Sequence, residues 1–183
     1  MTAAVHAAAV AALLEDGYAG LRIEDIAARA GVHKTTIYRR WGSRERLLAD
    51  ALAASSSRQI AVPDTGDVRT DLVTLALRVR DTVIAPSFRA VMTALAAGGQ
   101  HPELEEVGRG FWAARLAAAR PIVDRAVDRG ELDPGTDADD LIIRVVGPIW
   151  FAVFGPQRTP DDAFVARTVD VALGGSRSAG RAR

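Results

Sequence analysis

Residues 23–41 read IEDIAARAGVHKTTIYRRW. Apolar residues follow one face of a helix as far as Ala27 and stop at Gly31, and a second apolar stripe with Ile37 and Trp41 begins almost at once. Two short helices that cross at a tight turn need a small residue in the first helix and a glycine at the turn, because only then do they approach closely. Ala27 and Gly31 occupy those places. The stretch therefore predicts a helix-turn-helix.

Basic side chains are concentrated in and beside this motif. Between Arg29 and Arg46 there are six basic residues and a single acid, Glu45, although the whole chain has a formal net charge of zero. Surface arginines are most often a solvated helix face, but here they coincide with the predicted turn. A basic patch on an otherwise acidic chain is typical of a DNA-binding domain joined to a domain that does not bind DNA.

The rest of the chain also predicts helices. Apolar residues make up 49% of the sequence and aromatic residues only 5%, and the apolar content is mainly alanine, leucine and valine, which favour an all-α fold. A first helix is predicted over 2–16, ending at Gly17 as its C-cap, and a long helical pattern covers about 102–129. Pro121 lies inside that long pattern, so either the helix kinks there or two helices meet.

Local signals set the other predicted boundaries. Ser43 precedes one helix, Thr136 opens another, Gly147-Pro148 interrupts that second helix, and Thr159-Pro160 caps and opens the last one. Phe88 begins a further pattern that ends at Gly98-Gly99. With the polar stretch after residue 54, these signals predict a DNA-binding domain over 1–50, a helical body over 51–174 and a disordered tail over 175–183.

Several classes of protein are excluded by what the sequence lacks. It has no cysteine, and its three histidines are scattered, so no metal site and no cofactor are predicted. There is no nucleophile–base pair or phosphate loop, so no enzyme is predicted. The longest apolar run, 141–154, is shorter than a membrane span of about 20 residues. With no signal peptide in view, we expect a cytoplasmic protein.

The motif resembles that of a known family. Gly17-Tyr18, the stretch 23–41 and Ser43-Arg44-Glu45-Arg46-Leu47-Leu48 together resemble the DNA-binding domain of the TetR family in residue type and spacing. The resemblance implies an all-helical homodimer of about nine helices, with a three-helix DNA-binding domain and a ligand-binding body. It also implies pairing through the last two helices, operator DNA as a partner and a small-molecule effector that remains unknown.

The resemblance assigns DNA contacts to individual positions. It gives Lys34, Thr35 and Thr36 as candidates for the major groove, and Tyr38, Arg39, Arg40 and Arg44 as contacts to phosphates or base edges. His33 is expected at the start of the recognition helix, and Trp41 is expected to pack inside. Arg22 stands where the family often has a capping threonine; arginine cannot cap through a side-chain oxygen, but its charge can hold a phosphate.

One family feature is missing from the N-terminal segment. Residues 1–20 contain no lysine or arginine, whereas the resemblance implies a basic arm ahead of the first helix. Lower DNA affinity and a start codon further upstream both account for this. It is also the only support for an alternative function, a dimeric small-molecule carrier with weak or lost operator affinity.

The predicted body offers one candidate ligand site. Aromatic and sulfur-containing side chains in a helical body more often form core or a dimer interface, but pockets do form where packed helices separate. The hypothesis of an apolar effector site rests on Phe88, Met92, Phe111, Trp112 and Arg115. On this hypothesis the effector changes the separation of the two recognition helices and releases a repressor from its operator.

Overall fold

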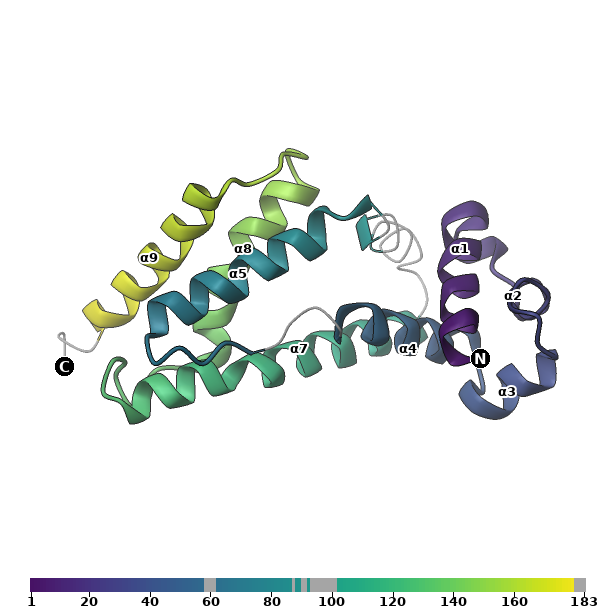
Figure 1. Cartoon of the computed structure of the whole chain (residues 1–183), viewed down its shortest axis with the longest axis horizontal. Helices are drawn as coiled ribbons and strands as arrows, with labels where there is room; N and C mark the ends of the chain where they lie inside the picture. The colour runs from purple at the N-terminus through teal and green to yellow at the C-terminus, as the bar shows by residue number, and fades with distance from the viewer. Residues whose placement is uncertain (58–61, 87, 90–91, 93–101, 180–183) are drawn as a thin grey trace. The chain divides into compact units, whose positions relative to one another are not determined.

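The structure is a computed structural model that describes residues 1–57, 62–86, 88–89, 92 and 102–179. These residues form eight helices and no strand, which confirms the predicted all-α fold. The chain divides into two compact units, which we describe separately (Figure 1). The first unit consists of Met1–Arg58 and Pro86–Trp112, and the second of Gln59–Ala85 and Ala113–Arg183. The first unit thus takes in residues that the sequence assigned to the body.

Four helices build the N-terminal part of the first unit. They are α1 (Thr2–Gly20), α2 (Ile23–Ala30), α3 (Lys34–Trp41) and α4 (Arg44–Ser57). Helix α1 packs against both α2 and α4, while α3 contacts α2 and α4. The shared core is apolar and includes Leu13, Ile26 and Ile37, each at most 1% exposed. Phe111 packs against this core from the later segment of the unit.

Helix α1 is longer than predicted but breaks where the sequence placed its end. Gly17 has φ 67° and ψ 177°, which is not a helical conformation, and helical structure then continues as far as Gly20. The predicted end at residue 16 therefore coincides with a break in α1, and a short further helical segment follows it. A glycine adopts positive φ at little cost, which explains why the break falls there.

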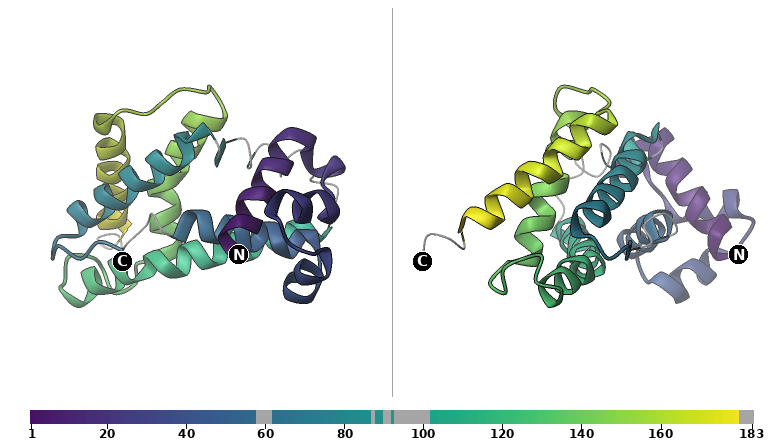
Figure 2. Two further views of the ribbon diagram at one scale, coloured as in Figure 1. Left: turned by 45° about the vertical axis from the view of Figure 1, so that its right-hand side comes forward. Right: turned by 60° about the vertical axis from the view of Figure 1, so that its left-hand side comes forward.

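The second unit is a bundle of long helices. It contains α5 (Val68–Ile84), α8 (Ala138–Phe154), α9 (Asp162–Ala179) and the later part of α7 (Pro102–Asp128). Both views in Figure 2 show α5 beside α8 and α9, and these three helices contact one another pairwise. Their facing side chains are buried and apolar, among them Leu72, Val145 and Val169.

Neither Pro121 nor Pro148 divides its helix in two. Helix α7 runs unbroken through Pro121, which excludes two helices meeting there, and α8 runs unbroken through Pro148. A proline inside a helix removes one backbone hydrogen bond. Both prolines are exposed, while Ile122 beside the first and Ile149 beside the second are fully buried. Packing of the flanking residues therefore holds each helix through its proline.

Two predicted helix starts are displaced by one or two residues. The Asp137 carboxylate accepts a hydrogen bond from the Asp140 amide at 3.0 Å, so Asp137 rather than Thr136 caps α8. The Asp161 carboxylate accepts from the Phe164 amide at 2.7 Å and caps α9 in place of Thr159. A carboxylate also interacts favourably with the positive end of the helix dipole.

The predicted disordered tail is wrong in its first part, because α9 continues to Ala179. Composition alone predicted disorder, but a packed helix propagates more easily than a new one nucleates. Residues 180–183 lie outside the described residues, as does most of the helix predicted from Phe88 to Gly98.

Candidate nucleic-acid interface

The turn between α2 and α3 has the geometry that the sequence predicts. Gly31 is left-handed, with φ 65° and ψ 33°. Around it, the Val32 amide donates to the Ala27 carbonyl at 3.0 Å and the Gly31 amide donates to the Ala28 carbonyl at 3.2 Å. These two bonds satisfy carbonyls that the end of α2 would otherwise leave unpaired. The turn is closed by backbone bonds and requires the glycine.

Helix α3 divides cleanly into a buried side and an outer side. Ile37 and Trp41 are buried, and Trp41 was predicted to pack in this way. The outer side is formed by His33, Lys34, Thr35, Tyr38, Arg39 and Arg40, with Thr36 half-buried. Tyr38 leaves 47% of its surface exposed, unusual for a large aromatic side chain without a partner surface. The structure thus brings together, on one short helix, nearly all of the predicted DNA contacts.

The start of α3 has no side-chain cap, but the Thr36 amide donates to the His33 carbonyl at 2.9 Å. His33 is the N-cap residue, as expected, but its ring bonds to the Thr35 hydroxyl, with Nδ1 and Oγ1 2.9 Å apart. Lys34 Nζ lies 3.4 Å from a carboxylate oxygen of Glu24. Arg22 is exposed and makes no side-chain cap on α2, in agreement with the sequence argument.

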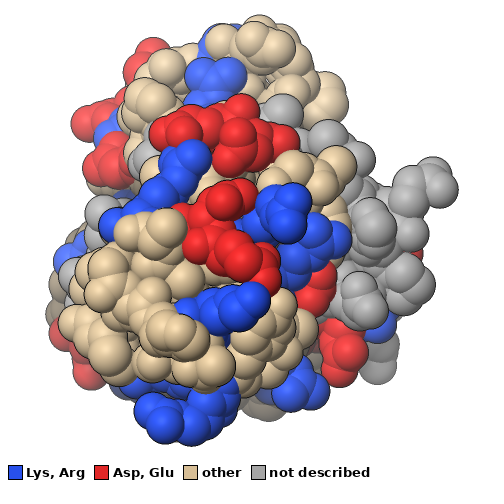
Figure 3. Space-filling view, turned by 90° about the vertical axis from the view of Figure 1, so that its right-hand side faces the viewer, with Lys and Arg blue, Asp and Glu red and all other residues tan. Residues whose placement is uncertain are grey.

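The basic charge of this region is partly balanced by acids in the folded protein. Arg29 pairs with Glu15 at 2.7 Å, just as Lys34 pairs with Glu24. Figure 3 shows Lys and Arg side chains lying beside Asp and Glu on the face that it displays, without an unbroken basic patch. Surface ion pairs of this kind are weak, so a DNA phosphate can replace the acid partner.

Arg44 has a role that the sequence did not predict. Its Nε donates to Glu45 Oε1 at 2.8 Å and its guanidinium donates to the Leu21 carbonyl at 3.1 Å. The same guanidinium lies 4.4 Å from the centre of the Tyr18 ring. Its side chain is only 30% exposed. Arg44 therefore fixes the α1–α2 junction to the start of α4, and its predicted DNA contact stays a prediction.

Tyr18 and Glu45 complete this cluster and were missed as functional candidates. The Tyr18 hydroxyl donates to Glu45 Oε1 at 2.6 Å. Burial raises the pKa of Glu45, but hydrogen bonds from Tyr18 and Arg44 outweigh it and bring that pKa from 4.5 down to about 2. Burial and the bond to Glu45 raise the pKa of Tyr18 from 10.0 to about 12. The only signal in the sequence was that Glu45 is the one acid among six basic residues.

Comparison with known proteins agrees with this geometry. The family model for bacterial regulatory proteins of the tetR family matches residues 6–51, and the one for the tetracyclin repressor-like C-terminal domain matches residues 62–172. The chain belongs to the TetR family. It is therefore a transcriptional regulator with a helix-turn-helix DNA-binding domain and not an enzyme.

Individual TetR-family proteins are similar over most of the chain. The DNA-binding transcriptional repressor TetR of Mycobacteroides abscessus is 34% identical over 94% of this chain and 91% of its own length. The regulator AqdR of Rhodococcus erythropolis is 34% identical over 76% of this chain and 68% of its own. The crystal structure of the TetR-family regulator SCO0332 superposes with a TM-score of 0.75 and 31% identity, covering 94% and 95% of the two chains.

The five predicted effector contacts are not all in one unit. Phe88, Phe111 and Trp112 belong to the first unit, together with Met92, whereas Arg115 belongs to the second. The Phe111 and Trp112 rings meet edge to face, 5.3 Å apart, and Trp112 is 40% exposed. Burial lowers the pKa of Arg115. In this TetR-family chain the effector site therefore stays a prediction.

Among the residues that the structure describes, no three His, Asp or Glu side chains come together as metal ligands could. None of the described helices has both the length and the apolar character needed to cross a membrane.

Proposed function

We propose that the protein is a homodimeric transcriptional repressor that a small apolar effector releases from its operator in the cytoplasm. The observation that carries the proposal is the outer side of α3, where Lys34, Tyr38 and Arg39 are exposed on a helix anchored by buried Ile37 and Trp41. A helix presented in this way fits the major groove, which is wide enough to admit it. The similar protein of Mycobacteroides abscessus is a repressor by name.

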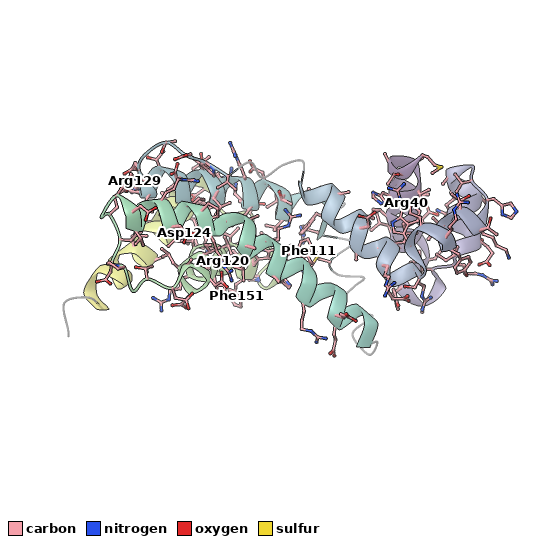
Figure 4. The ribbon with its side chains drawn as sticks, turned by 90° about the horizontal axis from the view of Figure 1, so that it is seen from below. Arg40, Phe111, Arg120, Asp124, Arg129 and Phe151 are labelled. Carbon is pink, nitrogen blue, oxygen red and sulfur yellow. The ribbon has the colours of Figure 1, made fainter. Side chains whose placement is uncertain are left out.

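Exposed apolar side chains on α8 and α9 support pairing through these helices. Ile143 on α8 is 52% exposed and Val171 on α9 is 75% exposed. Phe151 on α8, labelled in Figure 4, is 73% exposed. Large exposed apolar groups on neighbouring helices mark an interaction surface. We propose that a second copy of the chain covers this surface, since an operator with two half-sites requires two recognition helices at a fixed spacing.

The predicted effector contacts are mainly apolar, which supports an apolar ligand. We propose that Phe88, Met92, Phe111, Trp112 and Arg115 contact it. Release requires that the ligand bind more tightly to the conformation that cannot bind DNA than to the conformation that can. Complete release of DNA by the same ligand after Trp112→Ala and Met92→Ala would count against these contacts.

Operator binding is tested by mobility shift with the full chain. The DNA is the region upstream of the gene, together with sequences selected by the protein from a random pool. The test variant is Lys34→Ala/Tyr38→Ala, both exposed on α3. The control is Arg120→Ala, which removes one exposed basic charge from the second unit, at a residue paired with Asp139. Each protein is measured at two salt concentrations.

We expect specific binding that falls steeply with salt, because each neutralised phosphate releases counterions. The double variant should lose it and the control should keep it. No shift by any fragment, even at low salt, would contradict the repressor proposal. Binding of apolar ligands without DNA binding would instead favour the carrier, which the absence of lysine and arginine from residues 1–20 supports.

A further inference from the structure

The recognition helix is too short to hold its own orientation. It spans eight residues, and an isolated helix of that length is marginal in water. Its position therefore depends on the side chains that tie it to its neighbours. Ile37 does this near the middle by apolar packing, and Trp41 does it at the C-terminal end, where Gly42 then turns the chain at φ 76°.

Trp41 is tied by a directed bond as well as by packing. The indole N–H is a donor only, and a buried donor needs an acceptor. Asp50 on α4 supplies it, with Oδ2 2.8 Å from the indole nitrogen. The same oxygen lies 3.0 Å from Nε2 of His6 on α1, whose ring centre is 5.9 Å from that of Trp41. One carboxylate thus joins α1, α3 and α4.

The Trp41 ring also lies against a predicted DNA contact, Arg40. The Arg40 guanidinium carbon lies 5.1 Å from the ring centre, within the range of a cation–π contact. Arg40 is exposed (Figure 4). The orientation of the indole therefore determines where the Arg40 charge lies.

We propose that Asp50 is a positioning residue for operator recognition, which fixes the Trp41 indole and, through it, the end of α3 and the Arg40 guanidinium. The proposal rests on the proposed operator binding. It assigns no DNA contact to Asp50 itself. Asp50, Trp41 and His6 were not among the DNA contacts expected from the sequence.

The direction in which the loss of Asp50 changes operator affinity distinguishes a positioning role from simple charge repulsion. Removing an acid from a DNA-binding unit reduces repulsion of the phosphates and should strengthen binding. We expect Asp50→Ala to do the opposite and weaken operator binding about tenfold, the scale of one hydrogen bond to a charged acceptor. Asp25→Ala is the control, an exposed acid on α2; it should bind as tightly as the wild type or more tightly.

Three further variants identify Trp41 as the link. Asp50→Asn keeps a carbonyl oxygen that accepts from the indole, so it should restore most of the affinity. Trp41→Phe removes the donor together with part of the ring and should weaken binding at least as much as Asp50→Ala, with no further loss when Asp50→Ala is added to it. Displacement of Arg40 should lower the salt slope of Asp50→Ala by about 0.9, as Arg40→Ala does. Binding by Asp50→Ala as tight as that of Asp25→Ala would overturn the proposal.

A measurement without DNA keeps this test separate from that of operator binding. The indole N–H resonance of Trp41 is identified by its loss in Trp41→Phe. It should move upfield in Asp50→Ala, where the acceptor is missing, and stay near its place in Asp50→Asn. An unmoved resonance in Asp50→Ala contradicts the proposal even if that variant binds DNA poorly. If the wild type binds no operator, the proposed function is contradicted, but the resonance still tests the hydrogen bond between Trp41 and Asp50.

Discussion

At the scale of single residues, Glu45 accepts two hydrogen bonds at one carboxylate oxygen. Tyr18 donates to it at 2.6 Å and Arg44 at 2.8 Å, and the carboxylate is buried. A buried carboxylate is stable only when such partners are present. Since Arg44 also holds the Leu21 carbonyl, Glu45 supports the junction between α1 and α2 as well as the start of α4.

We expect Glu45→Gln to destabilise the protein by about 1–3 kcal/mol at neutral pH, because charge-assisted hydrogen bonds become neutral ones. The folded pKa of Glu45, about 2, lies below its ordinary 4.5. Its contribution is therefore present above pH 4.5 and is lost as the pH falls toward 2. Urea unfolding of wild type and variant from about pH 7 to about pH 3 should give curves that converge in acid.

Glu15→Gln is the control for this prediction. Glu15 is exposed and pairs only with the surface residue Arg29, so its free energy of unfolding should change by less than about 0.5 kcal/mol. A constant gap between wild type and Glu45→Gln down to pH 3 would show that the charge of Glu45 is not what stabilises the fold. Tyr18 has the opposite pH dependence, because its folded pKa is raised rather than lowered. Its stabilising hydrogen bond is present below pH 10 and is lost as the pH rises toward 12.

At the scale of elements, the start of α8 distinguishes two cap residues that are neighbours in sequence. The Asp137 carboxylate accepts from the Asp140 amide, whereas the sequence favoured Thr136. Asp137→Ala should therefore lower the free energy of unfolding by about 1 kcal/mol, the usual cost of a lost N-cap. Thr136→Ala should be nearly neutral. Thermal unfolding of both variants measures the two losses of stability. A larger loss in Thr136→Ala than in Asp137→Ala would identify Thr136 as the cap.

The elements that could be predicted are those whose cause is local. The turn at Gly31, the buried face of α3 and the length of α7 follow from spacing and from the conformational freedom of glycine. The interruption predicted at Pro148 was wrong, because a local rule ignores the packing on either side of the proline. Of the two alternatives at Pro121, a meeting of two helices does not occur. The end of α9 was misjudged because composition ignores the helix that precedes it.

The candidate site likewise has residues that the sequence predicts and residues that it does not. The exposed residues of α3 could be predicted, because helical periodicity separates them from Ile37 and Trp41. The bond between His6 and Asp50 joins residues 44 positions apart, and no local pattern reports it. The internal role of Arg44 depends on where the Leu21 carbonyl lies in space, which spacing does not reveal.

At the scale of the whole molecule, the proposed operator recognition depends on two copies of the chain. The recognition helix has eight residues, and dimeric helix-turn-helix proteins gain affinity by placing two such helices one turn of DNA apart. The chain exposes apolar side chains on α8 and α9. We therefore expect that a variant unable to pair also fails to bind its operator, although each DNA-binding unit is intact.

Phe151→Asp tests this expectation. Phe151 is 73% exposed in one chain, so the substitution should leave the fold of the monomer unchanged. Between two chains it would bury a carboxylate without a partner, which costs about 3–5 kcal/mol and raises the dimer dissociation constant at least about a hundredfold. Sedimentation equilibrium measures the association, and the mobility shift measures operator binding in the same samples.

Phe151→Leu is the matched control, because it keeps an apolar side chain and should stay dimeric and bind DNA. If Phe151→Asp remains dimeric, the pairing surface is not the exposed face of α8. If it becomes monomeric yet binds the operator as before, pairing is not what recognition requires. The expected result, loss of both properties at once, links the apolar face of α8 to the spacing of two recognition helices, since Phe151 and α3 belong to different units of the chain.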